Sequence, residues 1–118
     1  MTKKKILVVE ETAGATHGFV DALVRRELWD VHTAQAGPAA LCRADELRPD
    51  LLIADVRPRG GEGLRVARTL GWVRAVPSLL LSEVPGPCLA DLPSARLVLE
   101  RRCDEETLVR TVEDLLPA

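Results

Sequence analysis

The middle of the chain reads Arg48-Pro49-Asp50-Leu51-Leu52-Ile53-Ala54-Asp55, an unbroken apolar run that ends on a carboxylate. An apolar run without polar alternation is typical of a strand that is buried on both faces of a parallel sheet. Arg48-Pro49 ends the element before it, because the residue that precedes a proline avoids helical backbone angles. We therefore expect a buried strand here, with Asp55 at its carboxyl end.

The segments on either side of this strand alternate between two patterns. Short apolar runs predict four further strands, at residues 6–9, 30–34, 77–81 and 97–99. Apolar residues at helical spacing predict helices at residues 13–28, with Thr12 as the cap, and at residues 37–48. A third helix is predicted at residues 64–70, between a Gly-rich loop (Gly60, Gly61, Gly63) and a stop at Gly71. A last helix follows a cap at Asp104.

This alternation predicts an α/β fold, a doubly wound, five-stranded parallel sheet with helices on both faces. For this sheet we adopt 2-1-3-4-5 as the working strand order. One helix departs from the regular pattern. Residues 83–93 contain three prolines and a glycine, and proline interrupts a helix interior. We therefore expect a shortened fourth helix, of one turn at most.

Composition limits the class of protein. A length of 118 residues, with 47% apolar and 29% charged residues, suits one globular domain, placed at residues 3–117. The formal net charge is −2 and the only basic cluster is Lys3 to Lys5, so we expect no direct nucleic-acid binding. No apolar run reaches the ~18 residues of a membrane span, and no signal peptide is recognisable. We expect a cytoplasmic protein without membrane contact.

The cysteines are Cys42, Cys88 and Cys103, an odd number without CxxC spacing. This pattern argues against a disulfide framework and against a zinc site. We interpret each cysteine as a small apolar residue in a reducing compartment.

Polar residues gather where the predicted strands end. Glu10 and Glu11 follow the first strand, Asp55 ends the third, Ser82 follows the fourth, and Arg101 lies just past the fifth. The carboxyl ends of parallel strands form the edge at which ligands bind in such sheets. Three carboxylates would meet there, and like charges ~4 Å apart repel by about 4 kcal/mol at an effective dielectric of roughly 20. We expect such a cluster to bind a divalent cation, and carboxylate oxygens favour Mg²⁺.

From Lys3 to Leu116 the chain resembles a receiver domain of the bacterial response-regulator family. The resemblance is carried by the first strand with its acidic pair at residues 5–11, by the Asp55 strand at residues 48–55, and by Gly63 and Ser82 at the family's glycine and hydroxyl positions. It implies the flavodoxin-like receiver fold and a role in two-component signalling. The implied partners are a histidine kinase or phosphotransfer protein and a downstream protein or output domain.

The resemblance also implies roles for the residues at the strand ends. Asp55 would be the carboxylate that accepts a phosphoryl group from a kinase phosphohistidine. Glu11, Asp55 and a backbone carbonyl would hold Mg²⁺, with Glu10 acting through a water molecule. Ser82 would hydrogen-bond the new phosphate, and Arg101 would stand near it in the place of the family's lysine.

Five departures from the family pattern bear on that mechanism. The acidic pair is Glu-Glu where the family favours aspartates. The extra methylene lengthens each side chain, and Mg²⁺ tolerates little variation in the geometry of its ligands. The family's lysine position falls on Arg101 when it is counted back from the Asp104 cap, and on Glu100 when it is counted along the strand. An arginine there does not replace the lysine, because a planar guanidinium binds phosphate differently from a compact ammonium group. Pro58-Arg59 replaces the family's Met-Pro one place early, the fifth strand lacks the switch aromatic, and the fourth helix is reduced.

Two functional hypotheses follow. The first is a working phospho-receiver, whose phosphorylation at Asp55 changes its affinity for a partner. The second is a pseudo-receiver, a phosphorylation-independent protein–protein interaction module with the same fold. Neither is an enzyme in the usual sense; the first involves at most Mg²⁺-dependent self-phosphorylation.

Two more distant alternatives belong to the same fold class. A flavodoxin-like phosphate loop is faintly suggested by residues 12–16, but Glu10 and Glu11 would repel a phosphate and few aromatics are present to stack a flavin. A cobalamin-type Asp-x-His-x-x-Gly pattern begins at Asp30, but Gln35 stands where it needs glycine. We therefore interpret His32 as a half-buried strand residue.

Overall fold

The computed structural model describes residues 2–56, 61–82, 95–100 and 103–117. Five parallel strands form one sheet in the order β2-β1-β3-β4-β5, as predicted. The strands are β1 (Lys4–Glu10), β2 (Trp29–Gln35), β3 (Leu51–Val56), β4 (Ser78–Ser82) and β5 (Ala95–Glu100). The helices in the described residues are α1 (His17–Arg25), α2 (Pro38–Leu47), α3 (Gly61–Arg74) and α4 (Glu105–Leu115).

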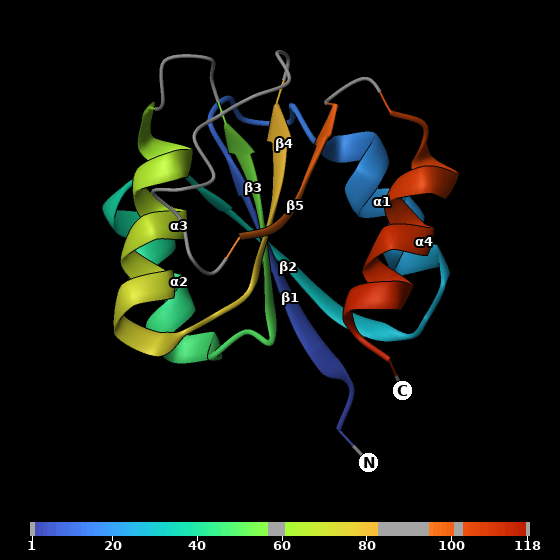
Figure 1. Ribbon diagram of the computed structural model, residues 1–118, viewed down its shortest axis with the longest axis horizontal. Coiled ribbons are helices and arrows are strands. Elements are labelled where there is room, and N and C mark those ends of the chain that lie inside the picture. Colours follow the sequence, from blue (N-terminus) through green and yellow to red (C-terminus); the bar gives the residue numbers. More distant parts are fainter. Residues whose placement is uncertain (1, 57–60, 83–94, 101–102, 118) are drawn as a thin grey trace.

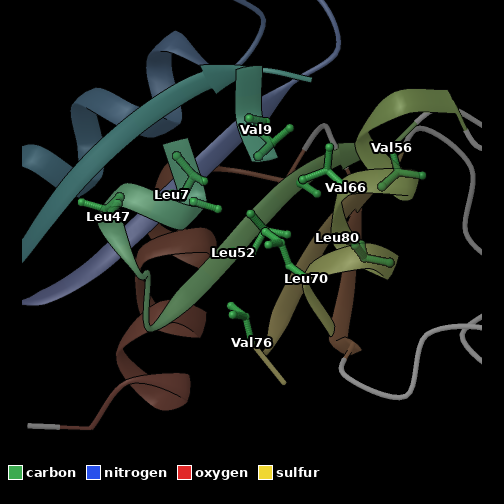
Figure 2. Close-up of a cluster of buried hydrophobic side chains, with 13 residues drawn as sticks. Leu7, Val9, Leu47, Leu52, Val56, Val66, Leu70, Val76 and Leu80 are labelled. Atoms are coloured by element: carbon green, nitrogen blue, oxygen red, sulfur yellow. The ribbon is translucent and has the colours of Figure 1, made fainter. Parts of the chain in front are cut away.

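The helices cover both faces of the sheet. Figure 1 shows α2 and α3 on one side of the strands and α1 and α4 on the other. Alternate residues of each strand therefore enter different cores: Leu7 and Val9 of β1 pack toward α2 and α3, whereas Ile6 and Val8 pack toward α1 and α4. Figure 2 shows the first of these two clusters. The strand sequences are continuously apolar because neither face meets water.

The first helix begins and ends inside its predicted limits of 13–28. Residues 12–16 form turns instead, in which the Ala15 N–H donates to the Thr12 carbonyl (3.0 Å) and the His17 N–H to the Gly14 carbonyl (3.2 Å). The predicted cap at Thr12 is therefore wrong, and Thr16 is the N-cap residue of α1. At the other end, Glu27 has a φ of 57°, which takes the chain out of the helix.

The third helix extends beyond its predicted limits in both directions. Gly61 and Gly63 belong to the first turn of α3 rather than to a preceding loop, and Gly71 lies within the helix instead of stopping it. The left-handed residue that ends this helix is Ala75, with a φ of 54°. The prediction failed because a stop glycine was assumed where an alanine adopts the conformation that favours glycine.

The other helix ends agree with the sequence. Gly37 and Pro38 open α2, and Arg48 closes it in the left-handed region. Asp104 caps α4 by accepting a hydrogen bond from the Thr107 N–H (2.7 Å). Hydrogen bonds from the Thr107 side chain and backbone lower the pKa of the Asp104 carboxyl. The shortened helix that the sequence predicts at residues 83–93 lies outside the described residues, and the label α4 belongs to the helix that follows β5.

Two composition-based expectations can be compared with the described residues. Cys103 is partly buried against the α1/α4 core, as expected, but Cys42 is exposed on the outer face of α2 and is no core residue. The inward face of α2 is occupied by Ala40, Ala44 and Leu47 instead. No helix in the described part of the chain is long and apolar enough to cross a membrane.

Candidate functional site

The candidate site lies at the carboxyl ends of the central strands. Asp55 is the next-to-last residue of β3 and is 1% exposed, and Ser82 is the last residue of β4 with the same exposure. The register pairs Asp55 with Leu81 and Val56 with Ser82, so the two candidate site residues lie on adjacent strands and differ by one residue in register. The buried carboxylate and the buried hydroxyl therefore lie at the edge where ligands bind in this type of sheet.

Glu10 is directed to the α1 side of the sheet. Its Oε2 atom accepts hydrogen bonds from the Thr16 N–H (2.9 Å) and from the Thr16 hydroxyl (2.6 Å). Thr16 is 1% exposed, and its backbone carbonyl accepts the Val20 N–H of α1 (2.9 Å). Glu10 thus ties the end of β1 to the first turn of α1.

Glu11 is directed to the opposite side. Its Oε1 atom accepts a hydrogen bond from the Gly63 N–H in the first turn of α3. Successive residues of an extended chain point to opposite faces of a sheet, which explains why the two adjacent glutamates reach different helices. The acidic pair is therefore divided between α1 and α3.

Glu11 nevertheless remains beside Asp55. A Cβ atom placed on Gly63 would collide with the backbone carbonyl of Asp55 and would lie 3.2 Å from Glu11 Oε1. The two oxygens therefore flank the same small space, and only a glycine fits between them. The sequence placed Gly63 in a loop, whereas in the structure it lies in the first turn of α3 and allows this turn to approach the end of β3.

The expected cluster of three carboxylates is thus not formed as one group. Within the described residues, no three His, Cys, Asp or Glu side chains are grouped so as to hold a metal ion. Glu11 Oε1 and the backbone carbonyl of Asp55 still provide hard oxygen donors near one another, which is the donor chemistry that Mg²⁺ prefers. Such a cation would keep several water ligands, and Glu10 would not contact it directly while it binds Thr16.

The remaining predicted site residues lie at the fifth strand. Arg101 falls outside the described residues. Glu100 is the last residue of β5, and its backbone is paired in register with that of Ser82. Which of the two occupies the lysine position stays a prediction.

Sequence reasoning missed two residues of this site. Thr16, the partner of Glu10, was noticed only as part of a weak phosphate-loop pattern, and Gly61 only as part of a Gly-rich loop. His32 was predicted correctly as a half-buried strand residue: its Nδ1 lies 2.8 Å from Arg43 of α2, and its Nε2 lies 2.9 Å from Asp30. These contacts place His32 among structural partners on β2 and α2.

No protein-family model matches the chain. Curated relatives do: the response regulator PleD of Caulobacter vibrioides is 33% identical over 85 residues, which are 70% of this chain and 18% of PleD. The DNA-binding response regulator MtrA of Mycobacterium tuberculosis is 32% identical over 80 residues, or 68% of this chain and 35% of MtrA. The chain thus spans only a fifth to a third of the length of these relatives.

Solved structures match almost the whole chain. Chemotaxis response regulator CheY4 of Vibrio cholerae has a TM-score of 0.78 at 23% identity, and the match covers 98% of this chain and all of CheY4. A response regulator from Thermotoga maritima gives 0.82 at 18% identity, covering 98% and 99%. The receiver domain of the putative response regulator NarL from Mycobacterium tuberculosis gives 0.79 at 24% identity, covering 97% and 96%.

The shared fold and the sequence similarity to two response regulators define the class of this protein. The chain is a CheY-like receiver domain of the response-regulator kind.

Proposed function

We propose that this receiver domain acts in the cytoplasm and takes a phosphoryl group on Asp55 from a histidine kinase or phosphotransfer protein. The observation that carries the proposal is the position of Asp55. Its carboxylate is 1% exposed at the ligand-binding edge of the sheet, and its backbone carbonyl and Glu11 Oε1 flank the same small space at Gly63. A carboxylate at that point has neighbouring oxygen donors for a cation and a hydroxyl, Ser82, one register step away.

The chemistry is a phosphoryl transfer between two side chains. A carboxylate oxygen of Asp55 attacks the phosphorus of the phosphohistidine, the P–N bond breaks, and the imidazole keeps the electron pair and takes up a proton. The product is an aspartyl phosphate on Asp55. Mg²⁺ held by Glu11 and Asp55 would neutralise charge on the transferring oxygens, and the protein contributes mostly position and charge.

The response to phosphorylation would begin at Ser82. A phosphoryl group carries about −1.5 to −2 charges and strong acceptor oxygens, and on Asp55 it replaces the single negative charge of the free carboxylate. We propose that the Ser82 hydroxyl donates to this group and that Arg101 supplies a positive charge beside it. Such contacts favour one of two existing conformations, and that shift changes the affinity for a downstream protein or output domain.

A second candidate is a phosphorylation-independent interaction module. It is favoured by the hydrogen bonds of the acidic pair, because Glu10 is bound to Thr16 and Glu11 to Gly63. In this alternative both glutamates hold helices in place, and the partner binds through the helical faces alone.

The test is phosphorylation of the purified chain with a small-molecule phosphodonor such as acetyl phosphate, with and without Mg²⁺. We expect a Mg²⁺-dependent mass increase of one phosphoryl group, and amide NMR shifts around Asp55, Glu11 and Ser82 when beryllium fluoride is added. Asp55→Asn should abolish both responses. The matched control Asp114→Asn, on the exposed face of α4, should retain them.

Absence of modification in the wild-type chain at millimolar Mg²⁺ would contradict the phospho-receiver. It would leave the interaction module as the function to pursue.

A further inference from the structure

A second group of ionisable side chains lies away from the strand-end site, where β2 meets α2. β2 is an edge strand of the sheet, and the side chain of His32 on this strand is 24% exposed. Its Nδ1 lies 2.8 Å from Nη2 of Arg43 on α2, and its Nε2 lies 2.9 Å from Oδ1 of Asp30 on the same strand. The imidazole therefore links the edge strand to the helix that covers it.

The contact with Arg43 determines where the imidazole carries its proton. A guanidinium has only N–H donors and no acceptor, so His32 Nδ1 must accept the hydrogen bond. A ring nitrogen has a single lone pair for this purpose, and a protonated nitrogen has none. In the observed arrangement His32 is therefore neutral, with its proton on Nε2.

The contact with Asp30 is of a different kind. Nε2 is buried and lies close to the Asp30 carboxylate, yet it makes no hydrogen bond within the described residues. The N–H group thus does not point along the line to the carboxylate oxygen, and a neutral ring gains little from this neighbour. A protonated ring gains more, because its positive charge then lies beside a carboxylate.

Protonation of Nδ1 would exchange the partners of both cationic side chains. His32 could no longer accept from Arg43, and two positive charges would face each other. Asp30 would then bind the imidazolium within β2. Arg43 already lies 3.6 Å from Glu46 through Nη1, so the guanidinium has a carboxylate on its own helix. One contact between two elements would be replaced by two contacts, each within one element.

The other charged side chains near this contact come from β1 and α2. Lys5 of β1 is in register with Asp30, and its ammonium group donates to the Leu47 carbonyl at the end of α2 (3.3 Å). Asp50 accepts the Lys5 backbone N–H (2.8 Å). Among these types of side chain, only an imidazole ordinarily changes its charge between about pH 5 and 8.

We propose that His32 is a proton-operated switch, which holds Arg43 of α2 against β2 when the imidazole is neutral and releases it when the imidazole is protonated. The inward face of α2 stays in the core through Ala40, Ala44 and Leu47, so the change is confined to the outer surface where β2 meets α2. The switch needs neither a cation nor phosphorylation, and it therefore goes beyond the proposed function.

The experiment follows the His32 ring nitrogens and the Arg43 guanidinium by NMR as the pH falls from 8 to 5. At pH 8 we expect an unprotonated Nδ1 and guanidinium N–H groups protected from exchange. This protection, corrected for the intrinsic effect of pH on exchange, should fall by about tenfold or more. That factor corresponds to the loss of one hydrogen bond to a charged group. The fall should follow the titration of the His32 ring.

Two variants with the same substitution separate the switch from general effects of pH, because His17 and His32 are the two histidines of the chain. In His32→Gln the amide oxygen can accept from Arg43 at any pH, so the guanidinium protection should not change between pH 8 and 5. His17→Gln alters an exposed residue of α1 that pairs with Asp21 (3.3 Å). It should respond to pH as the wild type does.

Three results would overturn the proposal. The first is a proton on His32 Nδ1 at pH 8, and the second is guanidinium protection that stays constant while the His32 ring titrates. The third is an equal response to pH in His32→Gln and in wild type. A failure of Asp55 to accept a phosphoryl group would contradict the phospho-receiver and leave these outcomes unaffected, so the two proposals fail independently.

Discussion

Glu10, the last residue of β1, and Glu11, the residue that follows it, contact different helices although they are adjacent in the sequence. Glu10 faces α1 and accepts both hydrogen bonds of Thr16 on a single carboxylate oxygen, whereas Glu11 faces α3. Hydrogen bonds to an ionised group contribute more than neutral ones, about 1.5–3 kcal/mol. Glu10 therefore contributes to stability by holding the turn before α1, independently of any cation.

The Thr16 hydroxyl is the testable half of this contact. Thr16→Val keeps the backbone N–H bond and the side-chain shape but removes the 2.6 Å hydroxyl bond to Glu10. We expect the free energy of unfolding to fall by about 1–3 kcal/mol, measured by urea denaturation. Thr33→Val, an exposed position on β2, is the control and should change it by less than about 0.5 kcal/mol. Equal effects of the two substitutions would show that the hydroxyl bond contributes nothing specific.

At the scale of elements, the helix ends differ in how well their residues suit the backbone. Arg48 and Ala75 both follow helices in the left-handed region, with φ values of 55° and 54°. A residue with a side chain pays roughly 1–2 kcal/mol for this conformation, whereas glycine does not. The end of α3 is therefore a place where the sequence is not optimal for its own fold.

Ala75→Gly should relieve this strain. We expect the substitution to stabilise the protein by about 0.5–1 kcal/mol, because the relief exceeds the added flexibility of the unfolded chain. Ala39→Gly makes the same change on the exposed side of α2, and there it should destabilise by about 0.5–1 kcal/mol. In thermal denaturation, the melting temperature should rise in Ala75→Gly and fall in Ala39→Gly. Changes in the same direction would contradict the backbone argument.

At the scale of the whole molecule, one sheet separates two apolar cores. Leu52 lies in the α2/α3 core, shown in Figure 2, and Leu108 lies in the α1/α4 core. Every central strand contributes alternate residues to both. We therefore expect the two layers to unfold together, as small single domains generally do.

Leu52→Ala and Leu108→Ala test this cooperativity. Both side chains are fully buried, so each substitution should cost about 2–5 kcal/mol. Val73→Ala, at a position 72% exposed, should cost less than about 0.5 kcal/mol. Far-UV circular dichroism and Gly63 amide exchange should report the same urea midpoint in each variant, and separate midpoints would indicate that the layers unfold independently.

Much of the site could be predicted from the sequence. The continuous apolar runs required a sheet covered on both faces, and the strand order then placed Asp55 and Ser82 at one edge. The ends of α2 and α4 were predictable because Gly37, Pro38 and Asp104 act locally. The limits of α1 and α3 were not. Local turns at residues 12–16 delay the start of α1, and the first turn of α3 makes a hydrogen bond to Glu11, which is 52 residues away from Gly63 along the chain.

Local backbone preference and strand periodicity are written in the sequence, and they predicted the fold class and the position of the candidate phosphoryl acceptor at the carboxyl end of its strand. The strand order 2-1-3-4-5 was a working assumption that agrees with the resemblance to receiver domains. Only the tertiary structure decided that Glu10 binds Thr16 and that Glu11 binds the Gly63 N–H of α3. Residue type and spacing predict that carboxylates meet at a sheet edge. The direction of each carboxylate depends instead on which donors the neighbouring helices bring within hydrogen-bond distance, and that is known only when the chain is packed.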